Sequence, residues 1–99
     1  SCTTSIDDQY VDTINQATED IKNANTFDDI KAATKQLIDF EHQHREALDE
    51  ALKGNPVKQA KVDKAYKLFM QTGMSRSSEL GRKSIEDTAA QQAAPTNNQ

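Results

Sequence analysis

The sequence predicts an all-α protein, an antiparallel three-helix bundle, on three observations. Apolar residues recur at intervals of three and four, which is typical of helices with one buried face. Three segments begin with residues that cap helices. The connections between these segments are short, which favours antiparallel neighbours. The predicted helices cover residues 5–25, 27–53 and 56–88, with a tether at 1–4 and a disordered tail at 89–99.

The first helix is predicted from the capping sequence Ser5-Ile6-Asp7-Asp8. The Ser5 oxygen can accept a hydrogen bond from a free backbone N–H of the first turn, and acidic residues favour the positive end of a helix. An Asn-Ala-Asn run at residues 23–25 ends the helix, because Asn tolerates the conformations that terminate helices. Its apolar stripe consists of Ile6, Tyr10, Ile14, Ala17, Ile21 and Ala24.

The second helix is predicted from a repeat of the capping pattern, Thr26-Phe27-Asp28-Asp29, directly after the first helix. We expect one helix over residues 27–53, which ends at the left-handed stop that Gly54 supplies. Its inner side consists of Ile30, Ala33, Leu37, Phe40, His44, Ala47, Leu48, Ala51 and Leu52.

The third helix begins after the clearest boundary in the sequence. Gly54 supplies a left-handed stop, Asn55 caps the next helix, and Pro56 fits its first turn. The apolar residues of this helix are Val57, Val62, Ala65, Tyr66, Phe69 and Met70.

The end of the third helix is less sharply marked. Gly73 and Gly81 each cost about 1 kcal/mol relative to Ala in a helix interior. We nevertheless expect the helix to reach Thr88, with Gly73 as the position where it would kink. The sequence leaves continuity across the two glycines open. From Thr88 onward only Ala, Gln, Asn, Thr and Pro remain, which predicts a tail with nothing to pack.

The length of 99 residues allows one small domain with a single core. A net charge of -4 is too modest to favour a fully disordered chain, although only 34% of the residues are hydrophobic. The predicted core consists of Tyr10, Ile14, Ile21, Phe27, Ile30, Leu37, Phe40, Leu48, Leu52, Val62, Tyr66 and Phe69.

A run of lysines recurs at every third position of the third helix: Lys58, Lys61, Lys64 and Lys67. A step of three drifts by about 60° on a helix, so these lysines should wrap around the surface. We expect a solvated face, with contact to an acidic partner or to anionic headgroups as the alternative. A sequence pI of about 5.0 argues against a nucleic-acid partner.

Glu41, His42 and His44 are the candidates for a metal site. The Glu41-x-x-His44 spacing is used in di-iron carboxylate bundles, which need a second such motif and two further Glu residues. The chain has only two His residues, so no cofactor is expected and His44 is a candidate pH sensor instead. No thiol–imidazole pair and no Gly-rich phosphate loop is present, so we expect no enzymatic activity.

The start of the chain carries its single cysteine, Cys2, followed by Thr3, Thr4 and Ser5. The chain does not begin with Met, so we expect that an upstream segment has been removed. This start resembles the mature N-terminus of a bacterial lipoprotein, where cleavage just before a Cys is followed by lipid attachment. The resemblance implies lipid attachment at Cys2, contact with the membrane through lipid only, and a location at the bacterial outer membrane or in the periplasm. An ordinary free thiol is the alternative.

Two short segments, Asp12-Thr13-Ile14 and Asp87-Thr88-Ala89, are similar to the Asp-Thr-aliphatic acceptor for protein O-glycosylation in some Gram-negative anaerobes. Thr88, at the predicted junction with the tail, is better placed as an acceptor than Thr13, which lies beside the apolar stripe.

The sequence therefore predicts a non-enzymatic helical interaction module of the bacterial cell envelope. It would be lipid-anchored through Cys2 and would act by contact with an unknown protein partner or with the envelope. The alternative is a soluble ligand-binding or helix-interaction bundle with an incidental Cys2. A metal-dependent activity at Glu41, His42 and His44 is a third hypothesis.

Overall fold

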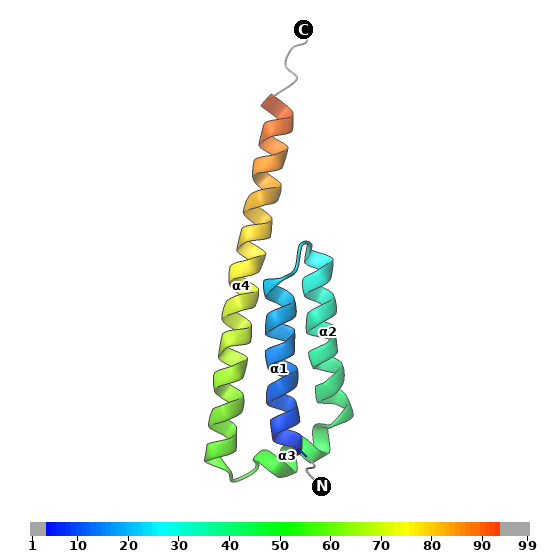
Figure 1. Cartoon of the computed structure of the whole chain (residues 1–99), viewed down its shortest axis with the longest axis vertical. Helices are drawn as coiled ribbons and strands as arrows, with labels where there is room; N and C mark the ends of the chain where they lie inside the picture. Colours follow the sequence, from blue (N-terminus) through cyan, green and yellow to red (C-terminus); the bar gives the residue numbers. More distant parts are fainter. Residues whose placement is uncertain (1–3, 94–99) are drawn as a thin grey trace.

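The structure, a computed structural model, describes residues 4–93 and is all-helical over that range, which confirms the prediction of an all-α protein. It has four helices there: α1 (Ile6–Lys22), α2 (Phe27–Gln43), α3 (Arg45–Leu52) and α4 (Pro56–Ala93). Figure 1 shows α1, α2 and the first half of α4 side by side, with α3 at the bottom, near the start of α1. With 38 residues against 17 in α1, α4 is about 57 Å long and extends well past its neighbours.

The predicted caps are present at the helix starts. The Ser5 side chain accepts a hydrogen bond from the Asp8 N–H at 3.4 Å. Thr26 and Asp29 form a reciprocal capping box, in which each side chain accepts from the other residue's backbone N–H. Gly54 has a φ of 66°, the left-handed conformation that favours glycine. Local chemistry therefore determines the connection between α1 and α2 and the connection between α3 and α4.

The prediction of one helix over residues 27–53 is wrong, because the chain forms two helices that meet at His44. His44 departs from helical geometry, with φ −117° and ψ 20°. Its N–H still donates to the Phe40 carbonyl at 3.0 Å, and its own carbonyl accepts from the Leu48 N–H at 2.8 Å. Two backbone hydrogen bonds therefore span the change of direction. Leu48, in α3, is buried in the core with only 6% of its surface exposed.

The prediction that the last helix ends near Thr88 is also wrong. The helix α4 continues across Gly73 and Gly81 to Ala93, so residues 89–93 are helical and do not belong to a tail. The rest of the predicted tail, residues 94–99, lies outside the described range, as does most of the predicted tether at 1–4. Ala and Gln are good helix formers, which explains why the helix persists where no packing is required.

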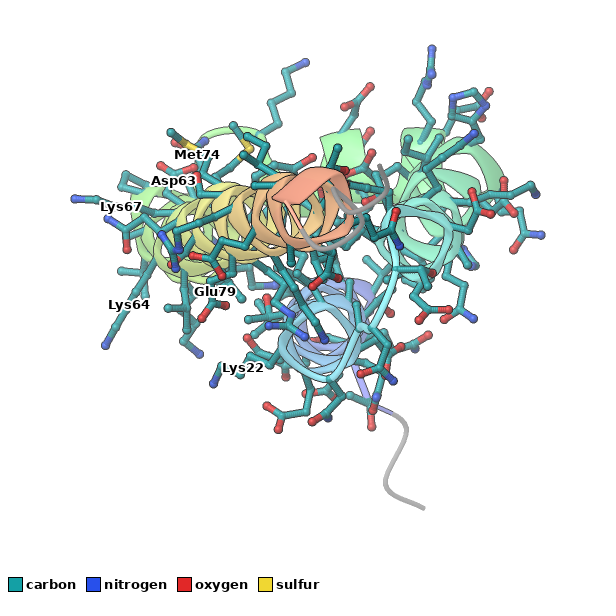
Figure 2. All side chains as sticks on the ribbon, turned by 90° about the horizontal axis from the view of Figure 1, so that it is seen from above. Lys22, Asp63, Lys64, Lys67, Met74 and Glu79 are labelled. Carbon is teal, nitrogen blue, oxygen red and sulfur yellow. The ribbon has the colours of Figure 1, made fainter. Side chains whose placement is uncertain are left out.

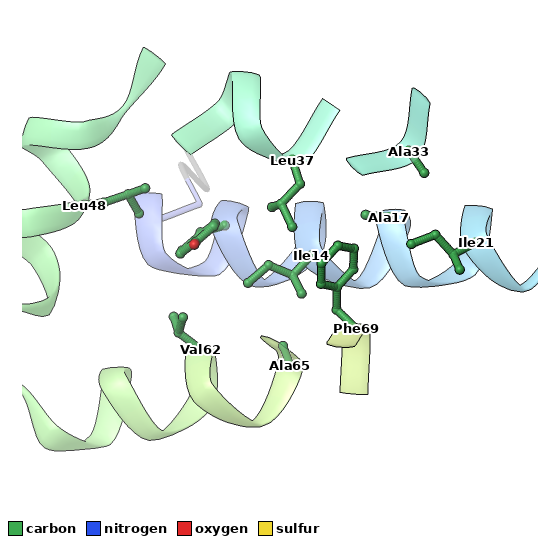
Figure 3. Close-up of a cluster of buried hydrophobic side chains, with 10 residues drawn as sticks. Ile14, Ala17, Ile21, Ala33, Leu37, Leu48, Val62, Ala65 and Phe69 are labelled. Atoms are coloured by element: carbon green, nitrogen blue, oxygen red, sulfur yellow. The ribbon is translucent and has the colours of Figure 1, made fainter. Parts of the chain in front are cut away.

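The core lies between α1, α2, α3 and the first half of α4 (Figure 3). Ile14, Ile21 and Leu37 are fully buried. The prediction was wrong for Phe27, which is 50% exposed because it is the first residue of α2 and lies at the margin of the core. The core also takes in Ala residues, which allow close helix approach. Its buried members are Tyr10, Ile14, Ala17, Ile21, Ala33, Leu37, Leu48, Val62, Ala65 and Phe69, and half-buried Ile30, Phe40, Leu52 and Tyr66 pack against them.

Candidate interaction groove

A groove with a volume of about 820 Å³ runs between α1 and α4, and we call it the α1–α4 groove. Figure 2 shows Lys64 of α4 and Lys22 of α1 projecting on this side of the molecule. The groove lies beside the contact between α1 and α4 and is open to solvent. Its lining residues are Asp8, Val11, Asp12 and Asn15 from α1, and Lys61, Lys64, Ala65, Lys67, Leu68 and Gln71 from α4.

The floor of the α1–α4 groove is apolar because it borders the core. Ala65 is buried against α1, and its small side chain leaves the floor hollow. Leu68 precedes the buried Phe69 in sequence and therefore lies at the edge of the helix contact, with 47% of its surface exposed. Val11 is half-buried on the α1 side. The groove thus presents apolar surface that residues 4–93 leave uncovered.

The two walls of the groove carry opposite charges. Asp8 and Asp12 lie on the α1 wall, and three lysines lie on the α4 wall: Lys61, Lys64 and Lys67. None of these five side chains takes part in an ion pair among the described residues. The ion pairs found there join Lys22 to Glu19, Lys35 to Asp39, Lys58 to Asp7, and Arg76 to Glu79. The wall charges are therefore available to a binding partner.

Two contacts fix the register of α1 against α4. The Lys58 ammonium lies 3.2 Å from Oδ1 of Asp7 at one end. At the other end, Nε of Arg76 donates to the Ala24 carbonyl at 2.9 Å, across 52 positions of sequence. The separation between Asp7 and Lys58 is one position less than that, so α1 and α4 run in the same direction with a constant offset. By this offset Asp12 stands at the level of Lys64, across the groove.

Asp7 was predicted only as part of the N-terminal cap of the first helix, yet the structure buries this charged residue, with only 4% of its surface exposed. Its Oδ1 is buried without a well-aligned hydrogen bond, so the Lys58 ammonium is its charge partner. Burial raises the pKa of Asp7, but a hydrogen bond from the Ser5 side chain and the Lys58 charge outweigh it, so the pKa lies below 3.8. The buried pair anchors the start of α4 to the start of α1.

The structure divides the predicted lysine run into two parts. Lys58 is half-buried at the Asp7 pair, whereas the other three lysines line the groove. The spacing of the lysines in sequence contains no signal for this division, because it depends on which side of α4 packs against α1. The guanidinium of Arg76, a further cation of α4, holds the connection between α1 and α2 through hydrogen bonds to the Ala24 carbonyl.

Glu41, His42 and His44, the candidates for a metal site, do not form a shared site in the structure. The Tyr10 hydroxyl donates a hydrogen bond to the Glu41 carboxylate. The His44 ring lies against Phe40 with 4.4 Å between ring centroids, and His42 is exposed. Among residues 4–93, no three His, Cys, Asp or Glu side chains come together in a group that could hold a metal ion. Glu41 therefore fastens α2 to α1, and this part of the structure provides no ligand set around the histidines.

The predicted modification sites are placed as follows. Thr88 is exposed on α4, and its hydroxyl donates to the Ser84 carbonyl at 2.9 Å. Thr13 is half-buried on α1, and its hydroxyl donates to the Gln9 carbonyl at 2.8 Å. Both residues thus lie within helices, and Thr88 is not at a helix end as expected. Cys2, the predicted lipid attachment site, lies outside the described residues.

Comparisons with known proteins give no match to a protein family, to a curated protein or to a solved structure. None of the helices described in residues 4–93 is long and apolar enough to cross a membrane.

Proposed function

We propose that this chain is a non-enzymatic helical interaction module that binds a partner protein through the α1–α4 groove. The unit that presents the groove is an antiparallel three-helix bundle of α1, α2 and the first half of α4, with α3 as its corner. The observation that carries the proposal is the combination of an uncovered apolar floor with charged walls that lack partners within the described residues.

An apolar groove with polar rims is the form in which helical domains receive an amphipathic helix. The floor around Leu68 supplies hydrophobic burial at about 25 cal/mol per Å² of apolar surface removed from water. The walls select the partner, because the basic wall around Lys64 attracts acidic residues of the partner and the acidic wall around Asp12 attracts its basic residues. The resulting preference is for a helix with an apolar stripe, acids along one flank and bases along the other.

The N-terminal residues add a location to this proposal. The resemblance of the first residues to a lipoprotein junction supports attachment of lipid at Cys2 and a place in the bacterial envelope. The full-length protein expressed in its native host should then be found in the membrane fraction, with the added mass of a diacylglyceryl group on Cys2. An unmodified protein in the soluble fraction would contradict the anchor and favour the alternative, a soluble bundle with an incidental Cys2.

The groove proposal is tested by matched substitutions in the tagged full-length chain. Leu68 in the groove and Ile38 on α2 are equally suited to the comparison, with 47% and 43% of their surfaces exposed. After chemical crosslinking in cells, Leu68→Glu should abolish the adduct between the chain and its partner protein, whereas Ile38→Glu should preserve it. Retention of the adduct by Leu68→Glu, or its equal loss in both variants, would contradict binding through the groove.

A further inference from the structure

The charges on the two walls of the α1–α4 groove are arranged so that one copy of the groove is complementary to a second copy. Its acidic wall belongs to α1 and its basic wall to α4, and the constant register of the two helices places Asp12 level with Lys64. By the same two contacts, Asp8 lies one to two residues, about 1.5–3 Å, from the level of Lys61. A rotation that exchanges the two walls therefore brings each acid opposite a lysine that lies within two residues of its own level.

We infer that the groove binds a second copy of this chain, related by a two-fold axis parallel to α1 and α4. This inference rests on the proposed function and names its partner. Rotation about such an axis keeps every residue at its level and places α1 of one copy on α4 of the other. Asp12 then faces Lys64 of the second copy, and the symmetry repeats the pair. A two-fold axis across the helices would instead stack the acidic walls on each other.

The apolar residues fit the same arrangement. The two grooves merge into the centre of a four-helix assembly of two α1 and two α4 helices. Leu68 and Val11 of both copies lie along this centre and lose their contact with water. Val57, which is 69% exposed, is eleven positions before Leu68, about three helical turns, and so extends the apolar side of α4 toward its start. The contact therefore buries apolar residues that are exposed in a single copy.

The direction of the axis also agrees with attachment to a membrane. Because the two copies run in parallel, both present Thr4 at the same end of the assembly. Two chains tethered through Cys2 to one membrane require this polarity, which an antiparallel pair does not provide. An isologous contact of this kind also closes on itself, so it gives a dimer and not an open fibre.

The test is sedimentation velocity of the full chain and of charge-reversal variants at low salt. The wild type should form a dimer, and Asp12→Lys or Lys64→Glu should each weaken it by about tenfold, because each reversal turns two symmetric attractions into repulsions. The double variant Asp12→Lys/Lys64→Glu should recover the dimer, since the swapped charges again face each other. Lys31→Glu on α2, an exposed lysine outside the groove, should leave the dimer unchanged. Circular dichroism verifies that each variant keeps its helix content.

Three outcomes would overturn the inference. The first is a wild type that stays monomeric up to about 1 mM, a concentration at which even a weak specific contact is populated. The others are a dimer that Asp12→Lys and Lys64→Glu do not weaken, and a double variant that dimerises no better than the single variants. The proposed function fails separately. A monomeric wild type whose adduct in cells still depends on Leu68 retains the groove and has another protein as its partner. Loss of that dependence removes the groove itself.

Discussion

The side chain of Lys58 is paired with the buried carboxylate of Asp7, with 3.2 Å between Nζ and Oδ1. The pair joins the first turn of α1 to the first turn of α4 and sets the lower end of the α1–α4 groove. Together with the hydrogen bond from Arg76 to the Ala24 carbonyl, it holds the acidic and basic walls level with each other. The groove therefore depends on contacts outside its own lining.

Removal of the Lys58 charge should destabilise the protein, because Asp7 would be left buried and unpaired. We expect Lys58→Met to lower the free energy of unfolding by about 1–3 kcal/mol, measured by urea denaturation. Lys61→Met, which removes a groove lysine without an ion pair, should change it by less than about 0.5 kcal/mol. Equal effects of the two substitutions would argue against a structural role for the pair.

Stability should also depend on pH through Asp7. Because its pKa is lowered below 3.8 in the folded state, the unfolded state takes up the proton first as the pH falls. The stabilising contribution is complete above the unfolded pKa and is lost as the pH falls through the folded pKa. In Asp7→Asn the free energy of unfolding should therefore decline less steeply than in the wild type below about pH 4. Parallel pH profiles of the two proteins would contradict this assignment.

The hydrogen bond from Tyr10 to Glu41 predicts a loss of stability at alkaline pH. Burial and the neighbouring Glu41 raise the pKa of Tyr10 and of Tyr66 above 10.0, so the unfolded state loses these protons first. The stabilising contribution is complete below about pH 10 and is lost as the pH rises beyond it. Tyr10→Phe should cost about 1–2 kcal/mol at pH 7 and flatten the alkaline decline. Urea midpoints between pH 7 and pH 11 measure both effects, and an unchanged alkaline slope would be inconsistent with a titrating Tyr10.

Packing of α4 on α1 is tested most simply at Phe69, which is 7% exposed in the core. Phe69→Ala should lower the free energy of unfolding by about 3–5 kcal/mol, because it removes a large buried side chain. Met74→Ala is the control, because Met74 is 70% exposed on the same helix, and it should cost less than about 1 kcal/mol. A loss below 1 kcal/mol for Phe69→Ala would contradict the observed core.

Local signals in the sequence predicted the parts of the fold that local chemistry determines. Ser5, Thr26 and Gly54 marked helix ends because a cap or a left-handed residue acts within a few positions. The stripe through Tyr10, Ile14 and Ile21 predicted the buried side of α1 for the same reason. These features can be predicted without information on the helices that pack against them.

The remaining features depend on tertiary packing. The helix breaks at His44, and Leu48 beyond the break is buried in the core, although no Gly or Pro lies near the break. The burial of Asp7 and the division of the lysine run follow from the side of α4 that contacts α1. The sequence supplied the charged residues of the groove, but their placement on facing walls arises only when α1 and α4 pack in register.

Site-specific photocrosslinking of the full-length chain in cells tests the groove most directly. A benzophenone amino acid is introduced at Leu68 in the groove and, as a control, at Glu50 on α3, which is exposed and outside the groove. Binding through the groove predicts a covalent protein adduct from position 68 that is absent from position 50 and reduced by Lys64→Glu. Absence of an adduct at position 68, or equal adducts at both positions, would contradict it.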